Sequence, residues 1–374
     1  MKMDIQMPPH GGQLDRIAEH FGVPVSGLLD FSANINPDGP PKSVVEALYE
    51  ALNDPSVLIQ YPDLEERQLR LSISAYTGAP YEAIVVANGF VPLLDAVLRT
   101  TPIRRCLLPV PAFGEYRSAL ERAGVSVTTH VLDQNADFRY QPDDLLEALL
   151  IGQHDSILLA NPQNPSGVLL ERASLIRFIE RTAKLNVLVL LDEAFIDYSP
   201  ENSLVWEVEH SPNLIVFRSV TKFHGIPGLR VAYMIANNTV DEGVRRSLSP
   251  WSITTLASIA VHTAFADTAY IRHTLRINHE RRERLVANLR ALGLHTYPTA
   301  ANFLLLRFPT ADEAQNCWER LILDHGIVLR NCSNFEGLDH NHLRCAVRSD
   351  EENSRLIEAL RIQLKRPENW PEVR

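Results

Sequence analysis

The sequence predicts an α/β protein with a doubly wound, mostly parallel sheet in a large domain and a small α+β domain beside it. The unbroken aliphatic run at 187–191 is typical of a strand that helices cover on both faces of a parallel sheet. Helix-like and strand-like patterns alternate up to about residue 235, which favours a doubly wound sheet. A mainly helical stretch at 252–293 then leads to a region of different alternation, which predicts the small domain.

Length, net charge and cysteine spacing exclude several classes of protein. The chain has 374 residues, which is enough for a large core and more than one domain. Its formal net charge of −10 argues against general binding to nucleic acids or to anionic membranes. We expect a cytoplasmic protein, because no apolar signal segment or membrane-spanning run is present. The cysteines have no metal-ligand spacing and are expected to be reduced and buried: Cys106, Cys317, Cys332 and Cys345.

A lysine in a loop between two predicted strands is the first candidate for chemistry. The apolar run 214–217 leads to Ser219, Thr221 and Lys222, and Arg230 precedes the next apolar run. A lysine at the end of a buried strand is poorly hydrated, which lowers its pKa and makes its amine nucleophilic. Two hydroxyl groups and a guanidinium suit a phosphate group. Considered alone, a lysine in this position is more often an ordinary solvated loop residue than a reactive one.

An aspartate at the end of the aliphatic run 187–191 favours the chemical alternative. Asp192 is costly at the end of so apolar a strand unless a cation meets it. Ligands of open α/β sheets bind at the carboxyl ends of the strands. A buried aspartate, a nucleophilic lysine and phosphate donors are what pyridoxal phosphate requires. The lysine carries the cofactor covalently, and the aspartate keeps the pyridine nitrogen protonated so that the ring accepts electrons.

Three ordered motifs connect these residues to a family. They are N-P-x-N-P-[ST]-G at 161–167, D-E-A at 192–194, and S-x-[ST]-K at 219–222 with a later G-L-R. Together they resemble the fold type I pyridoxal-phosphate enzymes of the aminotransferase superfamily. The resemblance implies that Asn164 contacts the ring hydroxyl of the cofactor and that the peptide bond between residues 164 and 165 is cis.

Further motifs indicate which group of enzymes within this superfamily the chain resembles. H-G-G at 10–12, L-D-F-S-A-N-I-N-P at 29–37 and P-W-S-I at 250–253 resemble the threonine-phosphate decarboxylases of cobalamin biosynthesis, which are relatives of histidinol-phosphate aminotransferases. The similarity covers nearly the whole chain. It implies a large cofactor domain at 41–264 and a small domain formed by 1–40 and 265–374, with the N-terminal segment over the active site.

The resemblance also implies a set of site residues. Lys222 and Asp192 are the expected catalytic residues. The expected cofactor contacts are Tyr61, Asn88, Gly89, Phe90, Phe113, Asn164, Asp192, Ser219, Thr221, Lys222 and Arg230. The expected substrate contacts are His10, Ser32, Asn34, Asn164, Arg330, Arg344 and Arg348.

The turn at Asn88–Gly89 supports a phosphate site independently of the resemblance. It joins the strand-like run 83–87 to a helix-like segment, and free amides at a helix N-terminus attract phosphate. Many strand-to-helix turns look like this, so the signal is weak alone. The family usually has small or acidic residues where this chain has Phe90 and Val91.

Two aromatic residues have expected roles. Phe113, at the start of a predicted helix, is either a core residue or the aromatic that stacks on the pyridine ring in the family. Tyr61 matches the tyrosine that reaches the cofactor phosphate of the neighbouring subunit, so we expect a homodimer with shared active sites. Gln60 replaces the arginine that relatives usually have before this tyrosine.

Three arginines are predicted on strands of the small domain. Arg344 and Arg348 have the same strand parity and are expected to face one side, although each arginine could simply pair with an acid. A cluster facing the cofactor would bind the anionic groups of a substrate. The resemblance implies that Arg344 holds a carboxylate and Arg330 a phosphate, so the expected substrate is a small phosphorylated amino acid or amine.

The cofactor does not determine which bond breaks. A carboxylate held in the ring plane favours transamination, and one held out of the plane favours decarboxylation. The resemblance predicts decarboxylation of L-threonine O-3-phosphate to 1-aminopropan-2-ol phosphate. The alternatives are an aminotransferase acting on histidinol phosphate or a similar amine, and a non-catalytic regulator with a degenerate site. The intact Lys222, Asp192, Asn164 and Arg230 argue against the regulator.

Overall fold

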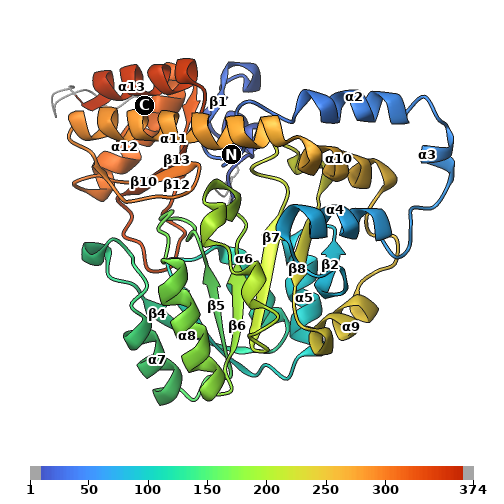
Figure 1. Cartoon of the computed structure of the whole chain (residues 1–374). Coiled ribbons are helices and arrows are strands. Elements are labelled where there is room, and N and C mark those ends of the chain that lie inside the picture. Colours follow the sequence, from blue (N-terminus) through green and yellow to red (C-terminus); the bar gives the residue numbers. More distant parts are fainter. Residues whose placement is uncertain (1–9, 365–374) are drawn as a thin grey trace, which may run out of the picture.

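The computed structural model describes residues 10–364, apart from the side chains of 238 and 239. Figure 1 shows a large domain around a central sheet and a small domain, orange to red, beside one end of that sheet. The predicted α/β class, with a large mostly parallel sheet and a small α+β domain, is confirmed. Within the described residues, none of the helices combines the length and apolar character needed to cross a membrane.

The central sheet has seven strands in the order β2-β8-β7-β6-β5-β3-β4. These strands are β2 (Ile84–Ala87), β3 (Arg105–Val110), β4 (Ser126–Val131), β5 (Ser156–Ala160), β6 (Leu188–Asp192), β7 (Leu214–Ser219) and β8 (Ala232–Ile235). The neighbours from β4 to β7 are parallel, and β8 is antiparallel to both β7 and β2. The parallel strands therefore have their carboxyl ends at one edge, which is where Asp192 and Ser219 lie.

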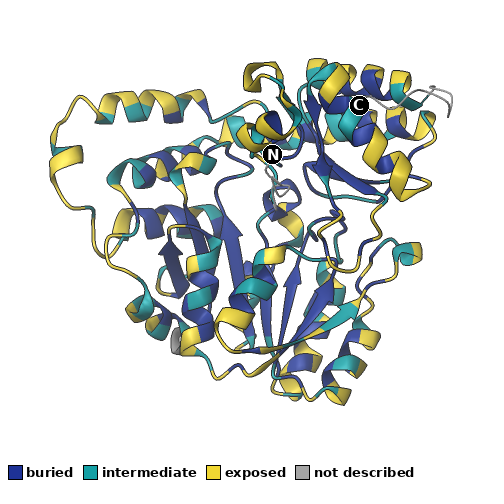
Figure 2. Cartoon of the chain, turned by 180° about the vertical axis from the view of Figure 1, so that it is seen from behind, coloured by how far each residue is buried: buried dark blue, intermediate teal, exposed yellow. Residues whose placement is uncertain are grey.

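Helices cover both faces of this sheet because alternate strand residues are apolar on each side. Val189 and Leu191 belong to one buried cluster and Leu190 to the other. The first cluster includes residues of α4 (Arg67–Thr77), α7 (Pro142–Ile151), α8 (Arg172–Lys184) and α10 (Thr255–Ala266). The second includes residues of α5 (Phe90–Thr100), α6 (Gly114–Arg122) and α9 (Asn238–Ser247). Figure 2 shows the resulting dark-blue strands between mixed-colour helices.

The small domain contains a four-stranded sheet in the order β12-β13-β10-β9. Its strands are β9 (His295–Thr296), β10 (Phe303–Arg307), β12 (Arg330–Asn331) and β13 (His342–Ala346). Its helices are α1 (Leu14–Phe21), α11 (Thr268–Ala291), α12 (Ala311–His325) and α13 (Asp350–Leu364). A capping box begins α13 as predicted, since Ser349 N donates to Glu352 Oε2 and Glu352 N donates to Ser349 Oγ.

The N-terminal segment belongs with the small domain. The short strand β1 (Leu29–Asp30) pairs in parallel with β11 (Ile327–Val328), as the adjacent blue and orange ribbons of Figure 1 show. The division into 41–264 and the remainder stays a prediction, and its upper limit lies two residues before the end of α10. Residues 1–9 and 365–374 of the predicted small domain lie outside the described residues.

Helix α2 (Lys42–Ala51) packs against α10, and its Val44 is buried in the first cluster. The short helix α3 (Ser56–Ile59) follows it at the outer edge of the large domain, at the right of Figure 1. The four cysteines are buried and not disulfide-bonded, as predicted.

Candidate active site

A cavity of about 590 Å³ lies at the carboxyl ends of the parallel strands, where the loop after β7 meets the N-terminal segment and the small domain. It brings together most of the residues predicted for the site. Those that line it are His10, Ser32, Asn34, Gly89, Phe90, Phe113, Asn164, Ser219, Thr221, Lys222, Arg230, Arg330 and Arg344. Asp192 lies at the end of β6 and acts electrostatically on Lys222.

Lys222 is held three residues beyond the end of β7. Its Nζ donates to Ser219 Oγ at 3.1 Å. Burial lowers the pKa of the Lys222 amine, and the positive charge of Arg230 acts in the same direction while Asp192 opposes it. A larger fraction of the amine is therefore neutral than in water, which is the form that acts as a nucleophile or base.

Gly89, Arg230 and two hydroxyl groups form a cradle for an anion. Gly89 has a φ of +102°, and a Cβ atom there would lie 2.8 Å from Nη2 of Arg230, so a larger residue would fill the space. Ser219 Oγ and Thr221 Oγ1 lie 2.8 Å apart. Because α5 begins at Phe90, its first-turn amides face the same place. The exposed Asn88 is not among the cavity-lining residues.

Asp192 is held by a tyrosine that the sequence reasoning missed. The Tyr116 hydroxyl, from α6, donates to Oδ2 of Asp192 at 2.5 Å, and the Ala194 amide donates to Oδ1 at 2.8 Å. Burial raises the pKa of Asp192, whereas the bond from Tyr116 and the charge of Lys222 act in the opposite direction. A cationic group brought against Asp192 would therefore keep this carboxylate ionised.

Arg344 connects the large domain with the N-terminal segment. Its Nη1 donates to Asn164 Oδ1 at 2.6 Å, and its Nη2 donates to the Ser32 carbonyl at 3.1 Å. Burial lowers the pKa of Arg344 to about 10. The Asn164–Pro165 peptide bond is cis, as predicted. Nearby, Asn34 Oδ1 is buried without a hydrogen-bond partner among the described residues, so it is available to a donor group of a ligand.

Two buried arginines lie side by side in this cavity. Arg330 of β12 is directly opposite Arg344 of β13 in the antiparallel register, so both side chains leave the same face. The Arg330 guanidinium donates to Asn334 Oδ1 at 2.6 Å and to the Asn331 carbonyl. Arg344 forms no ion pair with a carboxylate of the described residues. Adjacent like charges that are both buried are costly, and a bound anion would offset that cost.

The prediction that Arg348 lies on the same strand as Arg344 and faces the same side is wrong. Strand β13 ends at Ala346, and the chain then turns into α13. Arg348 Nη2 donates to Glu352 Oε1 at 2.6 Å, and Arg348 is not among the residues that line the cavity. A contact between Arg348 and a substrate stays a prediction.

Tyr61 also lies away from this cavity. Its side chain is 82% exposed, and its ring centroid lies 4.9 Å from that of Trp251. In the described chain Tyr61 is not among the lining residues, so its predicted cofactor contact requires the cavity of another subunit.

The structure adds two residues to the site, Tyr116 and Glu115. Both belong to α6, which begins directly after Phe113, and Glu115 lines the cavity. Phe113 is the extended residue that precedes α6, and its ring centroid lies 5.5 Å from that of Tyr116. A second aromatic residue three positions after Phe113 was the available signal.

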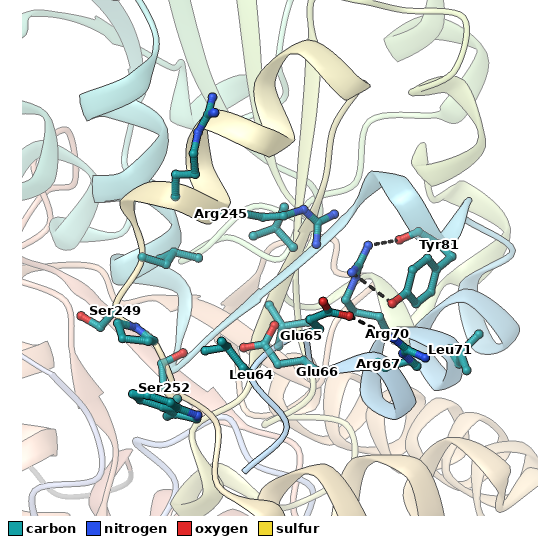
Figure 3. Close-up of a pocket in the computed structure, with 16 residues that line it drawn as sticks. Leu64, Glu65, Glu66, Arg67, Arg70, Leu71, Tyr81, Arg245, Ser249 and Ser252 are labelled. Carbon is teal, nitrogen blue, oxygen red and sulfur yellow. Dashed lines mark hydrogen bonds and ion pairs between the residues drawn. The ribbon is translucent and has the colours of Figure 1, made fainter. Parts of the chain in front are cut away.

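A second cavity of about 900 Å³ lies between the start of α4 and the end of α9. In Figure 3, Arg70 points toward Tyr81, and its guanidinium donates to the Tyr81 hydroxyl and carbonyl oxygens. Glu66 and Arg245 also line this cavity. It contains none of the predicted catalytic residues, so we place the chemistry at Lys222.

The comparisons with known proteins agree with this geometry. The family model of class I and II aminotransferases matches residues 26–360. The chain belongs to this family. As a class I and II aminotransferase-family enzyme, it depends on pyridoxal phosphate.

Individual relatives divide between two activities. The sequence is 36% identical to the threonine-phosphate decarboxylase of Salmonella typhimurium over 94% of this chain and 95% of that protein. It is 30% identical to the histidinol-phosphate aminotransferase of Methanosarcina mazei over 96% of this chain and 94% of that protein. The solved structure of the histidinol-phosphate aminotransferase from Clostridium acetobutylicum has a TM-score of 0.82 and 29% identity, with 90% of this chain and 99% of that chain covered.

The residues present fit the cofactor of the aminotransferase family. The Gly89 cradle with Arg230 suits its phosphate, and the absence of a Cβ atom at Gly89 leaves the space that the phosphate needs. Asp192 suits its ring nitrogen, and Lys222 suits its covalent attachment. Asn164 lies beside them and already orients Arg344, so the cofactor and substrate sites share one wall.

Proposed function

We propose that this enzyme decarboxylates L-threonine O-3-phosphate to 1-aminopropan-2-ol phosphate, a step of cobalamin biosynthesis. The substrate takes up one proton and releases CO2, so the reaction balances without a second substrate. The observation that carries the proposal is the cross-strand pair of Arg330 and Arg344 in the Lys222 cavity. The higher identity to a threonine-phosphate decarboxylase than to a histidinol-phosphate aminotransferase supports it.

The arginine pair suits a ligand with two anionic groups. Threonine phosphate carries a carboxylate and a phosphate, and each can take one guanidinium. Arg344 is the expected carboxylate partner because its Nη1 donates to Asn164, at the wall shared with the cofactor. Arg330 then serves the phosphate, together with His10 and Ser32 of the N-terminal segment, which line the same cavity.

The remaining residues support the chemistry. Pyridoxal phosphate, when bound, supplies the sink for the electrons of the bond that breaks at Cα. The Asp192 carboxylate would hold its negative charge against the pyridine nitrogen of the cofactor, and the Tyr116 hydroxyl fixes the orientation of that carboxylate. Lys222 Nζ, with its lowered pKa, can hold a proton and return it to the substrate carbon.

An aminotransferase acting on histidinol phosphate is the second candidate. Histidinol phosphate has a phosphate but no carboxylate, so it would occupy one guanidinium of the pair. An aminotransferase reaction would also leave the cofactor in its amine form until an oxo acid regenerates it. These differences make the two candidates separable in one set of assays.

The test compares substrates on the purified, cofactor-loaded enzyme. We expect kcat/KM for CO2 release from threonine phosphate to exceed kcat/KM for amino transfer from histidinol phosphate to 2-oxoglutarate by at least about a hundredfold. Absence of CO2 release combined with rapid amino transfer would overturn the proposal in favour of the second candidate.

We also propose that the enzyme is a cytoplasmic homodimer with shared active sites. Ile59, the last residue of α3, and Tyr61, two residues beyond it, are 80% and 82% exposed. The second cavity adds the exposed apolar side chains of Leu64 and Trp251 to this face. An apolar face of this kind fits a second copy that would receive Tyr61 in its own site.

Subunit mixing tests the shared site directly. A dimer of one Lys222→Ala subunit and one Tyr61→Ala subunit contains one site with both native residues. We expect activity to return when the two inactive variants are mixed and allowed to exchange. Mixtures that exchange subunits but stay inactive would contradict the sharing, and a monomer by light scattering would contradict the dimer.

A further inference from the structure

A hydrogen bond between an acid and an imidazole lies in the lining of the cavity. His10 of the N-terminal segment and Glu115 of α6 are joined by a hydrogen bond of 2.9 Å between Nε2 and Oε1. Both residues line the cavity that contains Lys222. With Glu115 ionised, His10 donates, so the contact fixes one proton on Nε2 and sets the orientation of the ring.

The segment that carries His10 is firmly attached on its other side. The Gly12 amide donates to Ser32 Oγ at 2.9 Å, and Ser32 Oγ donates to Asp30 Oδ1 at 2.6 Å. A Cβ atom on Gly11 would lie 2.2 Å from the Ser32 carbonyl oxygen, so this close approach requires glycine. Residues 11 and 12 are thereby held against the small-domain side, and Glu115 secures His10 to the large domain.

His10 also lies at the end of the cavity where Arg330 lies. A side cavity of about 460 Å³ adjoins the main one, and the two cavities have five lining residues in common. These shared residues are His10, Gly11, Ser32, Arg330 and Asn334. They therefore form the wall between the cavities, and both His10 and Arg330 belong to it.

Because Glu115 carries a negative charge, its contact with His10 affects whether the cavity can bind a phosphate. Glu115 itself lines the main cavity, and a carboxylate facing a dianionic phosphate would repel it. The bond to His10 directs that carboxylate toward a donor, and His10 itself belongs with Arg330 to the wall between the two cavities. A phosphate is then favoured when the contact is made and disfavoured when the contact is broken.

We propose that Glu115 is a positioning residue for phosphate recognition, which holds His10 in the wall beside Arg330 so that the site accepts a phosphate-bearing ligand. This inference rests on the proposed function for the class of substrate. It assigns no role to Glu115 in the reaction at Cα. Its effect is expected on the affinity for the anion and on KM, with kcat changed less than about twofold.

The experiment measures binding of inorganic phosphate to the cofactor-loaded enzyme by calorimetry, so that the cofactor's own phosphate site is filled. We expect Glu115→Ala and His10→Ala each to weaken binding by about tenfold. The double variant should bind no more weakly than either single variant, because each change removes the same contact. Glu115→Gln retains an acceptor for the His10 N–H and should stay within about threefold of the wild type.

A control variant and a measurement of local structure accompany the comparison of the single and double variants. Glu121 lies on the same helix and forms an exposed ion pair with Arg117, so Glu121→Ala should bind phosphate as the wild type does. Amide hydrogen exchange of residues 11–13 should accelerate in Glu115→Ala and stay unchanged in Glu121→Ala.

Two results would overturn the inference. The first is phosphate binding by Glu115→Ala that is as tight as wild-type binding or tighter. The second is a double variant whose loss equals the sum of the two single losses. Because these measurements need no turnover, a failure to release CO2 from threonine phosphate would count against the proposed function alone.

Discussion

Replacing Arg330 by alanine removes one member of the cross-strand arginine pair and leaves Arg344 in place. A hydrogen bond to a charged group contributes about 1.5–3 kcal/mol. Since about 1.4 kcal/mol corresponds to a tenfold change, kcat/KM for threonine phosphate should fall about 10- to 150-fold. The Arg344 bonds to Asn164 and to the Ser32 carbonyl do not involve Arg330, so we expect Arg344 to stay in place in the variant.

The assay compares threonine phosphate with unphosphorylated threonine, a slow analogue that retains the carboxylate. Arg330→Ala should lower kcat/KM for the phosphorylated substrate and leave the value for threonine nearly unchanged. Arg355→Ala, an exposed arginine on α13, is the matched control and should affect neither substrate. An equal loss on both substrates would mean that Arg330 supports the fold or the carboxylate, and the assignment of the phosphate to Arg330 would be refuted.

Three further predictions concern buried groups of the large domain. Borohydride reduction of the holoenzyme followed by peptide mapping should place the pyridoxyl group on Lys222, and labelling of another lysine would contradict the assignment. Asp192→Asn keeps the shape of the side chain but removes its charge, so the rate should fall by about a thousandfold or more, whereas near wild-type turnover would exclude Asp192 as the ring-nitrogen partner. Burial lowers the pKa of His224 from 6.5 to about 4, so as the pH falls the unfolded chain takes up a proton before the folded one does, and stability is lost. Between pH 8 and pH 5 this proton uptake lowers the free energy of unfolding by about 2 kcal/mol. Urea unfolding of the apoprotein at the two pH values should therefore show a decrease that is smaller by this amount in His224→Phe than in the wild type. An equal decrease in both proteins would contradict the burial of a neutral His224.

Local sequence patterns predicted the centre of the site. Asp192 ends the apolar strand β6, and Lys222 lies three residues beyond β7. Parallel strands bring their carboxyl ends together whatever the lengths of the connections between them. The phosphate cradle at Gly89 was predictable for a similar reason, because its turn joins an apolar strand to a helix N-terminus, where free amides attract phosphate. These features depend on short-range periodicity and turn chemistry.

Contacts between distant segments were less accessible to sequence reasoning. Tyr116 and Asp192 are 76 residues apart in the chain, and their bond depends on how α6 packs against the sheet. The register that places Arg330 opposite Arg344 is likewise set by tertiary packing. For Arg348 the strand pattern misled, since the capping box at Ser349 turns the chain out of β13.

The most direct test of the account follows L-[1-¹³C]threonine O-3-phosphate through the reaction in D₂O by nuclear magnetic resonance. Decarboxylation predicts labelled CO2 and bicarbonate, together with 1-aminopropan-2-ol phosphate that carries one deuterium at C1, in many turnovers per enzyme without an added oxo acid. Retention of the label in a phosphorylated oxo acid, formed once per enzyme as the cofactor is converted to its amine form, would contradict decarboxylation and identify an aminotransferase.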